Sequence, residues 1–159
     1  MWWMALALAG EPQVAIGDDG LLHASMEIDA PQEAVLAVLE DAKRMASWSP
    51  EVLAFEPEGE PAGGCQVYAV KTKGLWSPLT YRSKRCRTTT GYRDTLIESD
   101  AFKTMTSEWT VTAAGEGATK IAFVGDLELS FPVPKKLLSS SRVKGMQNTL
   151  TKLQEAAKP

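Results

Sequence analysis

Apolar and polar residues alternate along residues 21–28, which predicts a half-buried strand. Pro31 then begins a helix whose apolar stripe is Ala34, Val35, Val38 and Leu39. A second short helix is expected over 42–48, before Pro50. Helices this short are not stable alone, so both must pack on a sheet.

The alternating pattern returns after Pro50 and predicts six more strands. They are expected near 52–57, 64–73, 78–89, 92–99, 103–112 and 118–129. Short connections imply an antiparallel meander. A long amphipathic helix follows from near Val133, with an apolar stripe of Val143, Met146, Leu150, Leu153 and Ala157. Residues 11–20 are polar and end in Asp-Asp-Gly, so no strand is expected there.

The first ten residues are apolar and uncharged, too few to span a bilayer. With Ala7-Leu8-Ala9 as a small-x-small site they resemble the end of a secretory signal, although the basic segment that opens such signals is missing. A loosely packed extension is the alternative. We therefore expect a signal-like or disordered segment over 1–10 and a single domain over 20–159.

The two cysteines lie on strands expected to be antiparallel partners. If Lys73 pairs with Pro78 across the turn at 74–77, Cys65 faces Cys86 directly. Such a pair is near disulfide range. Two free cysteines in a slightly different register remain the alternative. A disulfide would favour a periplasmic or secreted protein over a cytoplasmic one.

The order of strand, two short helices, six strands and long helix resembles the helix-grip superfamily of START-related lipid-transfer domains, birch-pollen-allergen-like proteins and polyketide cyclases (SRPBCC). The resemblance covers residues 21–158 and is carried by Ile28-Asp29-Ala30-Pro31, then Val35, Val38, Leu39 and Asp41, then Trp48-Ser49-Pro50-Glu51-Val52. It implies an α+β fold in which a curved antiparallel sheet of about seven strands holds the C-terminal helix on its concave face. It also implies a cavity for the binding, or the binding and transport, of a hydrophobic or amphipathic small molecule such as a lipid.

The residues expected to line that cavity are apolar or aromatic, with one cation. They are Trp48, Tyr68, Val70, Tyr81, Arg85, Met105, Trp109, Met146 and Leu150. Mostly apolar walls with a few polar groups are typical of small-molecule sites, and Arg85 is the candidate to hold a ligand carboxylate or phosphate. The alternative is that these side chains fill a solid core, which would leave an interaction module without a ligand.

Charge is unevenly distributed. Residues 61–93 contain no Asp or Glu and seven basic residues, and an apolar pair, Leu75 and Trp76, lies at the expected hairpin tip. This tip could dock on an anionic membrane. Alternatively, the charges pair with neighbouring strands and Trp76 packs on the body. Nucleic acid is not an expected partner, because no motif for it is present.

An enzyme is the competing hypothesis, namely a cyclase or hydratase acting on a polyketide-type substrate. The acid–base candidates are Tyr68, Tyr81, Asp94, Glu98 and Glu108. Asp94 and Glu98 are expected on one strand face but about 13 Å apart, too far to act on one bond. No nucleophile–base pair, metal cluster or phosphate loop is evident, so we expect a monomeric binding protein without cofactor or metal.

Overall fold

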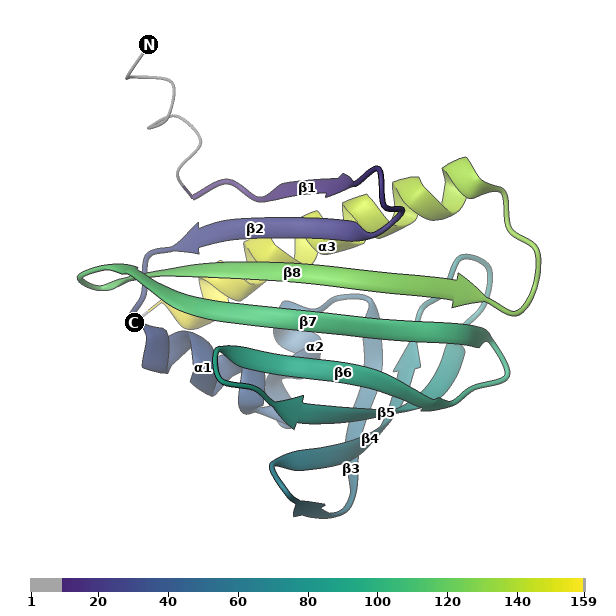
Figure 1. Cartoon of the computed structure of the whole chain (residues 1–159), viewed down its shortest axis with the longest axis horizontal. Coiled ribbons are helices and arrows are strands. Elements are labelled where there is room, and N and C mark those ends of the chain that lie inside the picture. Colours follow the sequence, from purple (N-terminus) through teal and green to yellow (C-terminus); the bar gives the residue numbers. More distant parts are fainter. Residues whose placement is uncertain (1–9, 159) are drawn as a thin grey trace.

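The computed structural model describes residues 10–158, which form one curved antiparallel sheet and three α-helices (Figure 1). The strands are β1 (Gln13–Ile16), β2 (Leu22–Ile28), β3 (Val52–Ala62), β4 (Cys65–Thr72), β5 (Leu79–Arg87), β6 (Gly91–Glu98), β7 (Phe102–Gly115) and β8 (Ala118–Leu129). Their order in the sheet is β1-β2-β8-β7-β6-β5-β4-β3. The predicted α+β helix-grip architecture is thus confirmed. Of the signal-like segment only Gly10 lies within the described residues.

The sheet has eight strands rather than about seven, because residues expected to be a loop form β1. Val14 and Ile16 pair with Ala24 and Leu22 across the turn that begins at Gly17. The prediction failed here because a four-residue strand with two large apolar side chains is too short to show the alternation of apolar and polar residues that identifies a strand. The extra strand extends the sheet beyond β2 and forms one of its two edges.

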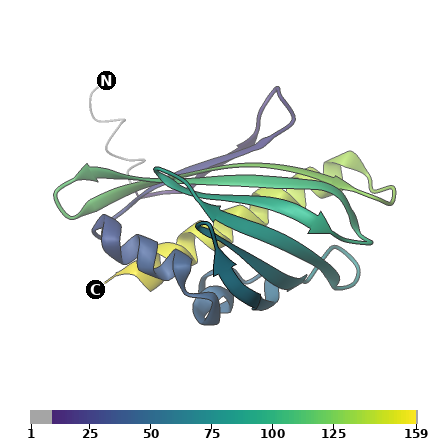
Figure 2. The ribbon, with the colours of Figure 1, turned by 60° about the horizontal axis from the view of Figure 1, so that its bottom comes forward.

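The helices lie on one face of the sheet. They are α1 (Gln32–Glu40), α2 (Met45–Trp48), which follows a 3₁₀ turn at Ala42–Arg44, and α3 (Lys135–Ala157). Figure 2 shows the sheet curving around α3, with α1 beside the C-terminal end of that helix. Helix α3 is continuous from Lys135 to Ala157 and includes the three serines at 139–141.

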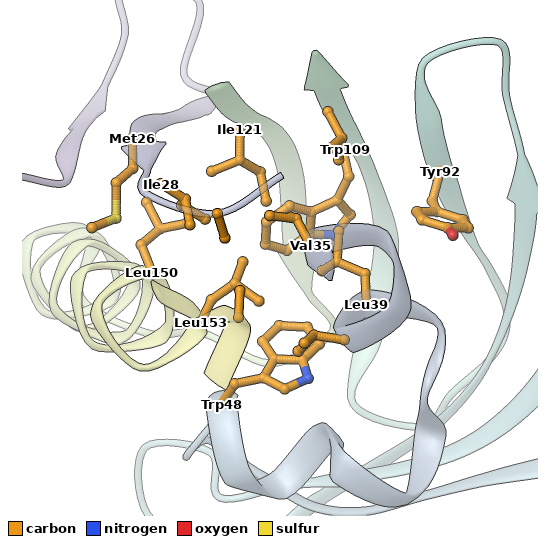
Figure 3. Packing of buried hydrophobic residues seen from close by; sticks show 14 of the residues in the cluster. Met26, Ile28, Val35, Leu39, Trp48, Tyr92, Trp109, Ile121, Leu150 and Leu153 are labelled. Carbon is orange, nitrogen blue, oxygen red and sulfur yellow. The ribbon is translucent and has the colours of Figure 1, made fainter. Parts of the chain in front are cut away.

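The hydrophobic core fills the end of the fold near α1 and the C-terminal half of α3. In Figure 3, Leu150 and Leu153 point from α3 toward the strands, and Trp48 of α2 lies beside Leu153. Leu153 and Ile121 are fully buried, and the Trp48 and Trp109 rings meet edge to face with centroids 6.2 Å apart. The tightly packed half of α3 therefore anchors the helix, and any cavity must lie toward its other half.

Candidate functional site

Two hollows that share a wall lie between the sheet and the N-terminal half of α3. The inner one has a volume of about 260 Å³ and the outer one about 320 Å³. Seven residues line both, among them Tyr81, Phe102 and Met146. The two hollows are therefore adjacent parts of one cavity region that extends from the interior to the surface.

Small residues leave this space open. Gly145 of α3 lines the outer hollow, and a Cβ atom placed there would lie 3.5 Å from the Glu51 side chain, in ordinary contact. Gly125 of β8 lines the inner hollow, and a Cβ atom there would come within 2.6 Å of the Phe123 ring, which occupies the space above it. The missing side chain at Gly145 thus leaves space in the outer hollow, whereas the one at Gly125 makes room for the Phe123 ring.

The inner hollow ends in a buried polar cluster. Arg85 Nε and Nη2 donate to the two carboxylate oxygens of Asp94 at 2.7 and 2.9 Å. Arg85 Nη1 donates to the Leu39 carbonyl at 3.3 Å, and Ser107 Oγ donates to Asp94 at 3.1 Å. This bidentate pairing leaves the inner end polar but without net charge.

Two aromatic rings flank the Arg85 guanidinium, with centroids 5.7 Å away for Phe55 and 5.5 Å away for Tyr92. Such contacts favour the charged guanidinium. Burial alone would lower the pKa of Arg85, but the Asp94 carboxylate outweighs it and holds that pKa above its usual value. Burial also raises the pKa of Tyr81, so its phenol is protonated and can donate a hydrogen bond to a ligand.

Six of the nine side chains expected at the cavity line it. These six are Trp48, Tyr81, Arg85, Met105, Trp109 and Met146. The other three belong to its surroundings: Tyr68 stacks on Phe55 with centroids 4.3 Å apart, Val70 is buried, and Leu150 is part of the core. Arg85 lies at the cavity as expected, but Asp94 already engages it.

Sequence reasoning missed several cavity residues. They are Phe55, Phe102, Phe123, Leu127, Thr149 and Arg142. Thr149 could have been found, since it follows Met146 by three residues and so shares its helix face. The aromatic residues could not be separated from ordinary core residues, because alternation along a strand shows which face a side chain occupies but not what covers it.

The acid–base candidates do not converge. Asp94 and Glu98 were expected on one face of β6, and this was wrong because a bulge at the β5–β6 pairing shifts the register between Ser83 and Arg82. Glu98 therefore binds exposed Arg82 at 3.1 Å instead of facing the cavity. Glu108 is exposed, while its neighbour Trp109 is buried.

The cavity opens at the hairpin tip between β4 and β5. Leu75 and Trp76 line the outer hollow, and Trp76 is 65% exposed although its ring lies 6.3 Å from that of Phe131. The tip turn requires Gly74, whose φ is +66° and where a Cβ atom would lie 2.2 Å from the Ser77 carbonyl oxygen. The mouth is thus framed by the tip at 73–78 and the segment that leads into α3.

The basic residues of 61–93 fall into two groups. Arg82, Arg85 and Arg87 form ion pairs with carboxylates on neighbouring elements. The other four, Lys71, Lys73, Lys84 and Arg93, form no ion pair with residues 10–158. Only part of the positive charge is therefore neutralised.

The predicted disulfide register is confirmed. Cys65 pairs with Cys86 in the β4–β5 ladder, and the structure has a disulfide between them. Across the described part of the chain, no helix combines the length and hydropathy of a membrane span. Within the same residues no group of three or more His, Cys, Asp or Glu side chains is placed to hold a metal ion.

Known proteins share this fold. The structure resembles the Zhui aromatase/cyclase from a Streptomyces species, with a TM-score of 0.76 and 16% identity over 86% of this chain and 92% of that one. It also resembles a START superfamily protein from Mycobacterium smegmatis, with a TM-score of 0.72 and 16% identity over 82% of this chain and 94% of that one.

A STAR-related lipid transfer protein from Xanthomonas axonopodis matches with a TM-score of 0.70 and 15% identity over 93% of this chain and 99% of that one. At these identities the likeness shows the fold alone. A sequence comparison with curated proteins finds no match. The family model described as "Polyketide cyclase / dehydrase and lipid transport" matches residues 21–158. The chain therefore belongs to the polyketide cyclase/dehydrase and lipid transport family.

Proposed function

We propose that this protein binds a hydrophobic or amphipathic small molecule, such as a lipid, in the cavity between the sheet and α3. The observation that carries the proposal is the cavity region formed by the two adjacent hollows. Its inner and outer parts, about 260 and 320 Å³, fall together in the size range of small-molecule sites. A solid core, the competing hypothesis, would leave no such space in a well-packed domain.

The chemistry of the walls supports the same proposal. Phe102, Leu127 and Met146 give both parts apolar surface, and methionine adapts to ligands of variable shape. Tyr81 offers a protonated phenol, and the Arg85–Asp94 pair offers a neutral polar end. A ligand with a long apolar body and few polar groups fits these walls better than a strongly polar one.

Filling the outer hollow tests this function. We expect Gly145→Phe to weaken uptake of the neutral dye N-phenyl-1-naphthylamine at least tenfold, because its ring would occupy the space that Gly145 leaves open. Fluorescence titration of the purified protein measures the affinity, and native mass spectrometry shows any lipid that co-purifies.

Gly145→Ala is the matched control. It should keep dye binding and raise the free energy of unfolding by about 1 kcal/mol, since alanine is the better helix former. Equal dye binding by Gly145→Phe, with unchanged circular dichroism, would place the ligand elsewhere. If the native chain takes up no dye and no ligand co-purifies with it, the solid-core hypothesis is supported and the binding proposal fails.

We also propose that the mouth docks on an anionic membrane. Exposed Trp76 lies beside Lys73, and Leu137 at the start of α3 is 42% exposed beside Lys135 and Lys136. Basic residues near an anionic surface contribute about 1 kcal/mol each, and tryptophan suits the interface. A ligand could then pass between membrane and cavity without crossing water.

Trp76→Ala should reduce binding to vesicles containing phosphatidylserine at least fivefold, because it removes the largest exposed apolar side chain at the mouth. Vesicle co-sedimentation at fixed salt provides the measurement. The control is Val124→Ala, which removes an apolar side chain of 37% exposure from β8, away from the tip. If both variants bind like the native chain, the tip does not contact membranes.

Catalysis on a polyketide-type substrate is the second candidate. What favours it is the cluster of Tyr81, Arg85 and Asp94 at the inner end of the cavity. Binding remains the better-supported function, because the Asp94 carboxylate is already held by Arg85 and Ser107 and is not poised as a base.

For location, we propose export from the cytoplasm, which the Cys65–Cys86 disulfide supports.

A further inference from the structure

Arg142 lies at the point where the inner and outer hollows meet. It lines the outer hollow from α3, on the same helix face as Gly145 and Met146. Its Nη2 donates to the carbonyl oxygen of Gly125 at 3.0 Å, and Gly125 lines the inner hollow. The guanidinium thus reaches across the cavity from helix to sheet, with further N–H donors left for a ligand.

Unlike Arg85, Arg142 has no carboxylate partner. It forms no ion pair with any residue from 10 to 158. Two acids are near: Glu51 lines the outer hollow, and Asp126, which follows Gly125 on β8 and is exposed, lines the inner one. Neither lies within ion-pair distance. The half-buried charge of Arg142 is therefore poorly compensated.

The pKa shifts also distinguish Arg142 from Arg85. Burial lowers the pKa of Arg142, and the attraction of Asp126 only partly offsets this effect. The neighbouring sequence adds no acid to these two, because residues 129–154 contain neither Asp nor Glu but do contain Lys135, Lys136, Lys144 and Lys152. A bound anion would reduce the cost of holding this charge in the cavity wall.

We infer that the ligand is an amphipathic anion whose carboxylate, sulfate or phosphate group binds Arg142 while its apolar chain fills the inner hollow. The inference rests on the proposed binding function and specifies which ligands it accepts. It also predicts how the ligand is oriented in the cavity. Because the Arg85–Asp94 pair carries no net charge, the inner end has no cation left to attract an anion. The charged group therefore stays near the mouth, where it is partly solvated.

Three probes with the same chain and different heads test this inference: dodecanoate, 1-dodecanol and dodecyltrimethylammonium. Each displaces N-phenyl-1-naphthylamine from the purified full chain at pH 8. We expect dodecanoate to bind at least tenfold more tightly than dodecanol, since hydrogen bonds to charged groups are the stronger ones. Dodecyltrimethylammonium should bind most weakly.

Arg142→Gln should reduce the affinity for dodecanoate to that for dodecanol, and it should leave the affinity for dodecanol unchanged. Lys144→Gln is the matched control, because it removes an exposed positive charge from the same helix; it should keep the preference for dodecanoate. Equal affinity for all three probes, tighter binding of the cation, or equal loss of dodecanoate and dodecanol in Arg142→Gln would each overturn the role of Arg142 while the cavity proposal stands. If neither dye nor probe binds the native chain, the cavity proposal fails, and this inference fails with it.

Discussion

Replacing Asp94 by alanine should lower the free energy of unfolding by about 3 to 5 kcal/mol. The change leaves the Arg85 guanidinium buried without its carboxylate, since the two side chains are only 11% and 13% exposed. The Ser107 hydroxyl loses its acceptor at the same time. Urea denaturation at 25 °C and constant salt measures the effect.

Two variants separate charge from packing. Glu98→Ala removes one of the two carboxylate partners of exposed Arg82 and leaves Glu58, so it should cost no more than about 1 kcal/mol. The double change of Arg85→Met with Asp94→Leu removes both charges and should be less destabilising than Asp94→Ala alone. If Asp94→Ala and Glu98→Ala have the same effect, the Arg85–Asp94 pair is not isolated from solvent as the structure indicates.

Removing the disulfide should lower the free energy of unfolding by about 3 kcal/mol. Cys65 and Cys86 are 21 residues apart in sequence, and a crosslink closing a loop of this length restricts the unfolded chain by roughly that amount. The comparison is between the native chain and the double variant Cys65→Ser/Cys86→Ser, both followed by urea denaturation.

The same native chain under a reducing agent should match the double variant, whereas the double variant should not respond to the reductant. Two titratable thiols in the unreduced protein would show that the bond does not form. An unchanged unfolding midpoint in the double variant would show that the bond forms but does not stabilise the fold.

The hairpin that carries this bond shows how far strand pairing follows from sequence. The turn at the tip sets the register of β4 and β5, so counting residues outward from that turn is enough to place Cys65 opposite Cys86. The same counting fails on the next pairing, because the bulge between β5 and β6 moves Glu98 to the outer face. A single inserted residue reverses which face each later side chain occupies, and alternation alone does not reveal it.

The cavity was the part of the structure that was hardest to predict from the sequence. Its apolar walls follow from the periodic patterns, and six of the expected residues do line it. Its volume depends instead on single positions such as Gly145 on α3, where a missing side chain leaves space, and Gly125 on β8, where it makes room for the Phe123 ring. Tyr68 illustrates the limit: it has the expected periodicity, yet it stacks on Phe55 of the edge strand and does not reach the cavity.

Arg142 escaped prediction for a related reason. It lies near the start of the amphipathic stripe, where a charged residue is normally solvated. In the folded chain its guanidinium lies within hydrogen-bond distance of the Gly125 carbonyl oxygen on β8, so the side chain is held against the sheet. The two arginines at the cavity therefore differ through partners that are distant in sequence.

The position of the disulfide has a mechanical consequence for the mouth. It joins β4 and β5 at the end of the hairpin opposite the tip, and the eight residues of β4 span about 25 Å. Strand β4 is also paired with β3, and β5 with β6, so the tip that carries Leu75 and Trp76 is the part of the hairpin outside the sheet. The crosslink therefore constrains the end of the hairpin that is far from the mouth, and we expect its reduction to loosen that end and not the tip.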